Sequence, residues 1–295
     1  MSVPSSVEKP PLRLVTAQGE SVDRDGQPLA QAPATQAPTA PVAAARPDLA
    51  GIAVPQVPPF SLPPSEADFA FFAEASAKLE TATPREILQW SVEHYFPKLT
   101  MATAFGPEGC VIIHLLAQIE PRVHVFNLDT GYQFNETLEL RERIRQRYGI
   151  EVELRRPETT VEEYEALNGG PVYKNEPDRC CAERKIKVLH ESAIGYRAWM
   201  SGIRRDQSTD RARAAIVEWD KKFNLVKISP LANWTKKDVW KLITDHDIPY
   251  NPLHDQGYTS IGCQPCTRAV LFGEDERAGR WSGFAKTECG LHTKD

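Results

Sequence analysis

The chain has 295 residues, six cysteines and a formal net charge of -5. This acidic balance argues against a nucleic-acid-binding surface, which normally shows a basic excess. No segment approaches the roughly 18 consecutive apolar residues of a membrane span, so we expect neither nucleic acid nor a membrane as a partner.

Composition divides the chain near residue 65. Residues 1–65 are rich in Pro, Ala, Gln and Val and show no apolar periodicity, which predicts a disordered leader. The leader has no signal-peptide pattern, and it carries acids such as Glu8 and Asp23, which transit peptides avoid. We therefore expect a cytoplasmic protein with one α/β domain over residues 66–295.

The first predicted helix begins at Thr83-Pro84-Arg85-Glu86, which combines a Thr cap, a proline in the first turn and a capping Glu. It should end near Tyr95. Residues 99–105 indicate a short buried strand. Gly106-Pro107-Glu108-Gly109 is expected to break this strand before an apolar helix over residues 110–117.

The same pattern then repeats. A strand over residues 122–128 is followed by the turn Asp129-Thr130-Gly131 and by a helix over 134–148 that ends at Gly149. Residues 150–155 indicate a third strand. Such alternation predicts a parallel twisted sheet with helices on both faces, whose ligand site lies at the carboxyl ends of the strands.

Two further strands are expected in the last third of the chain. The first covers residues 199–203 and leads into the polar run Arg204-Arg205-Asp206-Gln207-Ser208, a candidate ligand loop. The second covers residues 225–228 and precedes a helix capped by Thr235. The chain beyond is rich in glycine and irregular, with no internal repeat.

Four of the cysteines form two close pairs, Cys180-Cys181 and Cys263-Gln264-Pro265-Cys266, which we call the cysteine quartet. Four thiols are the number that a four-iron cluster or a structural zinc requires. Zinc ribbons use two Cys-x-x-Cys knuckles, whereas one pair here is adjacent, and successive helical side chains diverge by about 100 degrees. A larger cluster accommodates this divergence better than one ion, so we favour iron and sulfur over zinc.

The quartet and its neighbouring motifs resemble the assimilatory sulfonucleotide reductases, specifically the cluster-containing adenylyl-sulfate (APS) reductases. The resemblance covers residues 66–295. Its motifs are residues 103–109, Leu128-Asp129-Thr130-Gly131, Cys180-Cys181 with Arg184-Lys185, the loop 202–208, Cys263-Gln264-Pro265-Cys266, Arg277-Ala278-Gly279-Arg280-Trp281 and Glu288-Cys289-Gly290-Leu291-His292.

This resemblance implies an adenine nucleotide α-hydrolase-like (PP-loop-like) fold and a [4Fe-4S] cluster on Cys180, Cys181, Cys263 and Cys266. It implies thiol-dependent reduction of APS to sulfite and AMP, in sulfate assimilation and cysteine biosynthesis. Cys289 would be the nucleophile, on a flexible tail over about residues 282–295, and would carry an S-sulfonate. Thioredoxin or a glutaredoxin-like dithiol would then release sulfite.

A substrate with phosphate and sulfate groups should be surrounded by cations. We predict catalytic roles for Lys185, about one helical turn beyond the cysteine pair, and for His292. The predicted substrate-binding residues are Thr103, Phe105, Gly106, Asp129, Gly131, Arg204, Arg205, Arg277 and Arg280.

The first loop departs from the usual family pattern Ser-Phe-Gly-Ala-Glu-Asp, because Ala104, Pro107 and Gly109 stand where Ser, Ala and Asp are common. Phosphate contact there should therefore depend on backbone N–H groups and Thr103. Asp129 is almost equally suited to capping its own turn. The sixth cysteine, Cys110, opens an apolar run and is expected to be a core residue.

Three alternative functions stay open. The first is a reductase for the 3′-phosphorylated nucleotide (PAPS), and the second is an ATP-dependent adenylating or thiolating PP-loop enzyme. The latter class generally retains a Ser-Gly-Gly-x-Asp-Ser loop, which is lacking here. The third is a zinc-stabilised module without catalysis, whose purified protein would be colourless and contain zinc without acid-labile sulfide. A homo-oligomer is compatible with the sequence.

Overall fold

The computed structural model describes residues 14–15, 21–22, 63–286, 288 and 290. The chain divides into two units, residues 1–52 and 53–295. In the first unit, β1 (Leu14–Val15) pairs antiparallel with β2 (Ser21–Val22). This ladder is regular structure inside a leader for which the sequence predicts none, and the other residues up to 62 lie outside the described part.

The second unit is built on a six-stranded sheet with the strand order β5-β4-β3-β6-β8-β7. Five strands run parallel, and β7 pairs antiparallel with β8 at one edge. This confirms the predicted parallel sheet and adds an edge strand that was not predicted. The strands are β3 (Leu99–Thr103), β4 (His124–Leu128), β5 (Val152–Arg155), β6 (Ala198–Met200), β7 (Val217–Asp220) and β8 (Leu225–Ile228).

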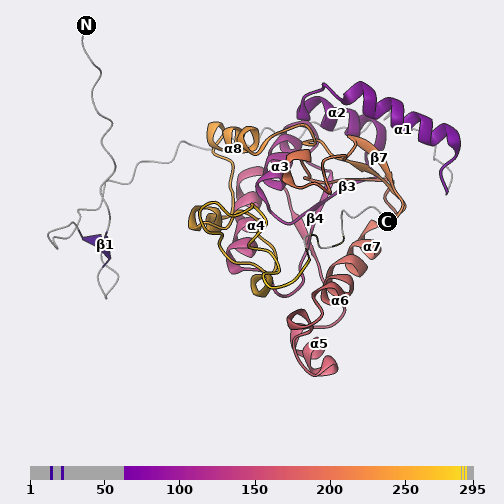
Figure 1. Ribbon diagram of the computed structural model, residues 1–295. Helices are drawn as coiled ribbons and strands as arrows, with labels where there is room; N and C mark the ends of the chain where they lie inside the picture. Colours follow the sequence, from indigo (N-terminus) through magenta and orange to yellow (C-terminus); the bar gives the residue numbers. More distant parts are fainter. Residues whose placement is uncertain (1–13, 16–20, 23–62, 287, 289, 291–295) are drawn as a thin grey trace, which may run out of the picture. The chain divides into compact units, whose positions relative to one another are not determined.

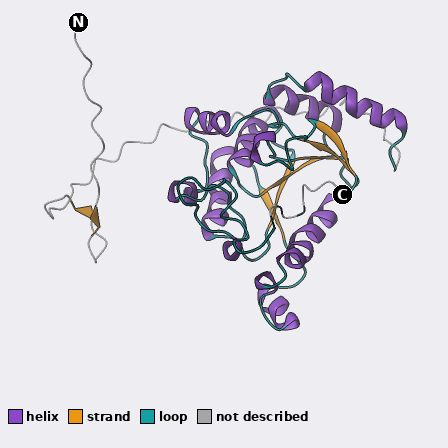
Figure 2. Ribbon diagram, viewed as in Figure 1, coloured by secondary structure: helices purple, strands orange, loops and turns teal. Residues whose placement is uncertain are grey.

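Helices lie on both sides of this sheet (Figures 1 and 2). The α-helices are α1 (Glu66–Leu79), α2 (Pro84–Tyr95), α3 (Pro107–Ile119), α4 (Asn135–Tyr148), α5 (Val161–Asn168), α6 (Pro177–Cys181), α7 (Lys187–Ala193) and α8 (Lys236–Asp245). A π-helical segment, Ala182–Ile186, joins α6 to α7. Short 3₁₀ segments are Val172–Lys174, Arg205–Gln207, Pro252–Gln256 and Gln264–Cys266.

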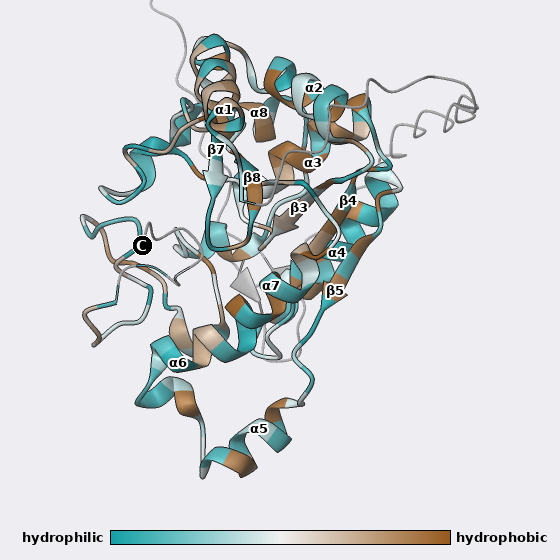
Figure 3. Ribbon diagram, turned by 90° about the vertical axis from the view of Figure 1, so that its right-hand side faces the viewer, coloured by the Kyte–Doolittle hydropathy of each residue, from teal (hydrophilic) through white to brown (hydrophobic). Residues whose placement is uncertain are grey.

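Two apolar clusters sandwich the sheet because alternate residues of each strand face opposite sides. Met101 and Val226 pack in the larger cluster with apolar residues of α1, α2, α3, α4 and α8. Phe126 and Trp199 face the other side and pack with Val188 and other residues of α7. Figure 3 shows the apolar residues concentrated along α3 and the inner strands. The prediction of helices on both faces is therefore confirmed.

The start of α3 differs from the expectation. Gly106-Pro107-Glu108-Gly109 was predicted to be a break, yet the helix begins at Pro107 with Gly106 as its N-cap. Proline suits the first helical position because its fixed φ is helical and its missing N–H has no intrahelical partner there. The consequence is that the helix N-terminus, and not a free loop, faces the carboxyl end of β3.

Other helix ends follow the predicted signals. Thr83 caps α2 in a complete capping box, and Gly149 ends α4 in the left-handed conformation at φ 66°. α1, which was not predicted, begins after the N-cap Ser65. Within the described part of the chain, no helix is both long enough and apolar enough to cross a bilayer.

Candidate active site

A cavity of about 370 Å³ opens at the carboxyl ends of the parallel strands, and we call it the strand-end cavity. Thr103 at the end of β3, Leu128 at the end of β4 and Ser201 directly after β6 all line it. The first turn of α3 forms another part of the wall. This is the position at which open α/β sheets bind ligands.

The charges around this cavity favour an anion. Six lining residues are Lys or Arg, whereas only two are Asp or Glu. Backbone N–H groups at the start of α3 add positive potential, as helix N-termini do. The cations are Lys185, Arg204, Arg211, Lys236, Arg277 and Arg280, and the acids are Glu108 and Glu276.

Of the ten described residues predicted to bind substrate or to act in catalysis, the structure brings six to this cavity, although their roles stay predictions. Those that line it are Thr103, Gly106, Lys185, Arg204, Arg277 and Arg280. Four other predicted substrate-binding residues do not appear in the lining, namely Phe105, Asp129, Gly131 and Arg205. Each of these four has a local role in holding a loop.

Phe105 shapes the first loop from inside the core. Its side chain is buried, its φ is 55°, and its N–H donates to Thr103 Oγ1 over 3.0 Å. The same hydroxyl explains why residue 109 is a glycine, since a Cβ at that position would lie 2.6 Å from Thr103 Oγ1. The departure from the family pattern at residue 109 is thus coupled to Thr103. Cys110 is buried beside them, as predicted, and burial raises the pKa of its thiol to about 12.

Asp129 and Gly131 build the turn after β4. Asp129 Oδ1 accepts the N–H of Gly131 over 3.0 Å, and Oδ2 accepts from Arg156 Nε over 2.8 Å. Gly131 has a φ of 80° and a Cβ there would lie 2.6 Å from Val161. Both carboxylate oxygens of Asp129 are therefore engaged within the protein, which agrees with the turn-capping alternative.

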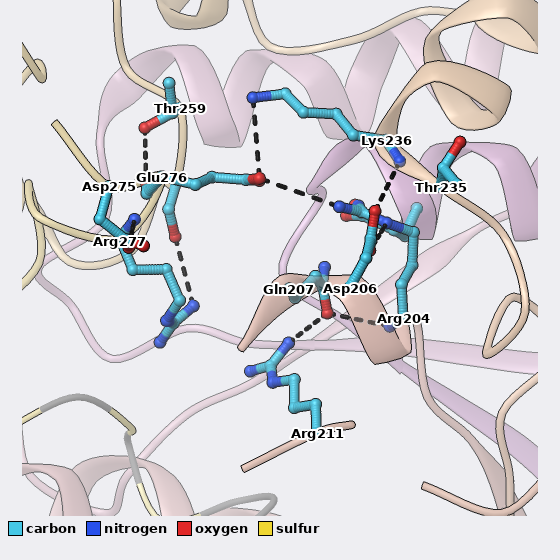
Figure 4. A network of polar contacts seen from close by, with 12 residues as sticks. Arg204, Asp206, Gln207, Arg211, Thr235, Lys236, Thr259, Asp275, Glu276 and Arg277 are labelled. Atoms are coloured by element: carbon cyan, nitrogen blue, oxygen red, sulfur yellow. Dashed lines mark hydrogen bonds and ion pairs between the residues drawn. The ribbon is translucent and has the colours of Figure 1, made fainter. Parts of the chain in front are cut away.

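The adjacent arginines 204 and 205 point to different surroundings. Arg204 is 1% exposed and pairs with Glu108 and, over 2.8 Å, with Asp206, as part of the network in Figure 4. Arg205 instead pairs with Glu80 and donates to the carbonyl of Ala214. Arg204 has an extended backbone, in which neighbouring side chains face opposite ways.

Several residues near the cavity were not singled out in the sequence. Lys236 Nζ lies 3.7 Å from Glu276 Oε2, and Arg211 Nη1 donates to Gln207 Oε1 over 2.6 Å (Figure 4). His254 also lines the cavity, and burial lowers the pKa of its imidazole. Gln207 belongs to the candidate ligand loop 202–208, whereas Arg211, Lys236, His254 and Glu276 come from segments far apart in the chain and carry no local motif that would identify them.

A second, smaller cavity adjoins the first and is lined by all four members of the quartet, so we call it the cysteine cavity. Its remaining wall is largely aromatic and apolar, with three cations. The cations are Arg184, Lys185 and Arg280, and the other lining residues are Thr130, Tyr132, Tyr173, Pro177, Pro265 and Trp281. Two segments separated by more than eighty residues thus present their thiols to one space.

Local structure explains how the two pairs meet. Cys180 and Cys181 end α6, and the wider π-helical turn follows them directly. On the other side, residue 263 forms an antiparallel bridge with Gln133, and the N–H of Gln264 donates to the carbonyl of Tyr132 over 2.7 Å. Thr130 Oγ1 lies 3.2 Å from Cys263 Sγ. The turn after β4 therefore carries the Cys-x-x-Cys knuckle.

All four cysteines of the quartet line the cysteine cavity. Among the described residues, no three His, Cys, Asp or Glu side chains lie close enough to hold a single metal ion. The thiols nevertheless interact electrostatically. Burial, and secondly the charges of the other three cysteines, raise the pKa of Cys180 to about 12. Burial and the neighbouring cysteines likewise raise the pKa of Cys266 to about 11.

Arg184 supplies a buried positive charge beside the quartet. It is 3% exposed, donates from Nε to the carbonyl of Thr130 over 2.8 Å, and lies over the rings of Tyr132 and Tyr164. No ion pair joins it to a carboxylate in the described part of the chain. A buried cation of this kind favours negative charge on the neighbouring thiols.

Lys185 lines both cavities, as do Thr130, Cys263 and Arg280. The prediction that Lys185 lies near both the quartet and an anion site agrees with this placement. Two predicted catalytic residues, Cys289 and His292, lie outside the described residues. The neighbours of residue 289, Glu288 and Gly290, are described, and they contact Arg211 and Lys222.

These features define an α/β protein with a cationic ligand cavity at its strand ends and a thiol-lined cavity beside it. Residues 98–269 match the model of the phosphoadenosine phosphosulfate reductase domain. The chain belongs to this family, which confirms the resemblance found in its motifs.

Similar proteins include the adenosine 5′-phosphosulfate reductase of Bacillus velezensis, 45% identical over 70% of this chain and 89% of that protein. The phosphoadenosine 5′-phosphosulfate reductase of Gloeobacter violaceus is 44% identical over 72% of this chain and 90% of that protein. The crystal structure of a phosphoadenylyl-sulfate reductase from Candida auris, in a phosphate complex, is similar with a TM-score of 0.61 and 27% identity, covering 70% and 98% of the two chains.

Proposed function

We propose that this protein reduces adenosine 5′-phosphosulfate to sulfite and AMP with electrons from an external dithiol, as a step of sulfate assimilation toward cysteine in the cytoplasm. The observation that carries the proposal is the shared wall of the two cavities, where Lys185 and Arg280 lie between an anion site and four thiols. The relatives named as reductases of this nucleotide support the choice of substrate.

The strand-end cavity suits a nucleotide that carries a phosphosulfate. The start of α3 and the Thr103 segment line it, as do Lys185, Arg277 and Arg280. We assign the phosphosulfate to these cations because the leaving AMP gains negative charge as the sulfur–oxygen bond breaks. Arg204 would act mainly by holding Glu108, since its charge is already paired.

Cys289 is the proposed nucleophile. Its thiolate attacks the sulfur of the nucleotide, a sulfur–sulfur bond forms, and the bond to the phosphate oxygen breaks so that AMP leaves with the electron pair. A thiolate of thioredoxin or a similar dithiol then attacks Cys289 Sγ, and sulfite leaves with the electrons of the sulfur–sulfur bond. The second thiol of the donor reduces the mixed disulfide and restores Cys289.

The cysteine quartet fits a [4Fe-4S] cluster by donor chemistry, because four sulfurs line one space with the buried cation of Arg184 beside it. A structural zinc ion held by the same four sulfurs is the alternative, and metal and acid-labile sulfide analysis separates the two. When bound, such a cluster would supply fixed negative charge that holds Lys185 at the boundary with the strand-end cavity. Reducing equivalents would still come from the external dithiol.

A second candidate substrate is the 3′-phosphorylated nucleotide, PAPS. The relative from Gloeobacter violaceus, which is named as a reductase of that nucleotide, is 44% identical to this chain, nearly the same as the others. The ratio of kcat/KM for the two nucleotides separates these alternatives. We expect APS to be preferred by at least about 10-fold, which corresponds to about 1.4 kcal/mol.

The test of the function compares sulfite release by the anaerobically purified protein and by Cys289→Ser, with thioredoxin and APS present. We expect the variant to lose at least about 1,000-fold in kcat, since removing a covalent nucleophile removes the reaction path. Cys110→Ala serves as the control because its thiol is buried in the core. Normal sulfite release by Cys289→Ser would refute the proposed mechanism.

A further inference from the structure

The residue before Cys289 is held by two arginines. Glu288 is buried, and its two carboxylate oxygens accept from Arg211 Nε and Nη2, each over 2.9 Å. Arg277 Nη2 lies 3.3 Å from Glu288 Oε2. A planar fork of two parallel hydrogen bonds fixes both the distance and the orientation of the carboxylate.

The residue after Cys289 is held as well. The carbonyl of Gly290 accepts from Lys222 Nζ over 2.8 Å. A Cβ on Gly290 would lie only 2.8 Å from Ile186 Cδ1, so this backbone passes directly against the neighbour of Lys185. Glu288 and Gly290 are the sequence neighbours of Cys289, so these contacts hold the chain on both sides of the proposed nucleophile.

Arg211 uses its guanidinium group to hold Glu288 and one further side chain. It is 9% exposed, two of its nitrogens bind Glu288, and the third donates to Gln207 of the candidate ligand loop 202–208 over 2.6 Å. With its donors used in this way, Arg211 connects the tail to the wall of the strand-end cavity without offering a free fork to a ligand. Arg277, in contrast, also lies 3.4 Å from Ser260 and has further contacts.

We propose that Arg211 is a positioning residue that acts through Glu288 to orient the thiolate of Cys289 for attack on the sulfonucleotide. This inference rests on the proposed function. Both partners of the pair are nearly fully buried, so the geometry is rigid, and replacing either one leaves a buried charge without its partner. We expect such replacements to slow the chemical step, because a small displacement of a nucleophile strongly lowers the rate of its attack.

The experiment is a single turnover at saturating APS without reductant, in which mass analysis follows sulfonate formation at Cys289. Arg211→Lys keeps the charge but loses the fork, and Glu288→Gln keeps the shape but loses the charge. For each we expect a rate on the order of 100-fold below that of the unaltered protein. The affinity for AMP should change less than about 3-fold, since neither side chain is assigned to the nucleotide.

Two further measurements separate positioning from a general structural role. The double variant should be no slower than the slower single variant, because both changes disrupt one pair. Without substrate, iodoacetamide should alkylate Cys289 faster in Arg211→Lys and Glu288→Gln, since their tail is no longer held. Arg145→Lys is the matched control, because Arg145 forms a similar fork with Glu142 on the exposed face of α4.

The outcomes are distinct. If the unaltered protein forms the sulfonate and both variants form it equally fast, the role of Arg211 is refuted while the function stands. If AMP affinity falls together with the rate, Arg211 contributes to nucleotide binding and the positioning role is also refuted. If the unaltered protein forms no sulfonate at Cys289, the proposed function itself fails.

Discussion

The two adjoining cavities differ in the way they gather their residues. The strand-end cavity collects six cations from several helical and loop segments, and two acids offset part of that charge. The cysteine cavity has walls that are mainly aromatic and apolar, and its thiols come from two short segments. A polar cavity can admit and release a charged substrate, whereas a drier one retains a tightly held group.

The wall that the two cavities share provides a route by which a change in one cavity can affect the other. Thr130, Lys185, Cys263 and Arg280 line both cavities. A change in either region therefore reaches the other through few side chains, and substitutions can separate the contribution of each cavity.

The largest effect should follow from removing one member of the quartet. Cys263→Ser should lose iron and its visible absorption, and we expect turnover to fall at least about 1,000-fold, because parts of one catalytic unit fail together. Iron analysis, absorbance and sulfite release on the same anaerobic preparation measure this. Undiminished turnover in a folded protein without iron would show that the two cavities work independently.

Lys185 provides the next test. Lys185→Ala removes the cation that faces both cavities, so we expect kcat/KM to fall by about 100-fold, as for the loss of one preorganised charge. Iron content should stay near normal, since the ligands are intact. Lys185→Arg, which keeps the charge, should recover part of the rate, and equal loss in both variants would contradict an electrostatic role.

Arg204 and Arg205 test stability instead of rate. Arg204→Gln leaves Glu108 without its buried partner, and the free energy of unfolding should fall by about 3 kcal/mol in urea denaturation of the anaerobic protein. Arg205→Gln breaks a more exposed pair with Glu80, so its loss should stay below about 1 kcal/mol. Equal losses would show that burial does not distinguish the two arginines.

Thr130 should give the smallest effect. Thr130→Val removes the hydroxyl that lies 3.2 Å from Cys263 Sγ but preserves the size of the side chain. Because outer hydrogen bonds support a metal ligand, iron loss to a chelator should become about 10-fold faster. AMP affinity should change less than about 3-fold, and a larger change would assign the hydroxyl to the nucleotide side.

Much of the fold was predictable from local signals. Buried strands, glycine turns and capping residues such as Thr83 gave the main parallel sheet and several of its helices. β7 was not predicted because it is a strand of only four residues at the edge of the sheet. α1 was not predicted because Phe69, Phe71 and Phe72 distribute its apolar residues around the helix instead of along one face. Pro107 was misassigned as a break, although the N1 rule that identified α2 also applies to α3.

The sequence predicted which residues belong to the site better than it predicted which residues contact one another there. Motifs led to the quartet and to Lys185, which the structure places around adjoining cavities. Sequence could not tell that Arg204 is paired with Glu108 or that Arg211 binds Glu288, because such pairs join residues far apart in the chain. Long-range pairing depends on how loops pack at the sheet edge, and a single sequence carries no local signal for it.

The central claim is a division of labour between the quartet and the solitary Cys289, and one measurement tests it most directly. The anaerobic protein is incubated with APS labelled in its sulfur, without reductant, and the labelled peptide is located by mass analysis. The account predicts one sulfonate per chain on the peptide that contains Cys289, and its release as sulfite when thioredoxin is added. Label on Cys180, Cys181, Cys263 or Cys266, with none on Cys289, would contradict the account.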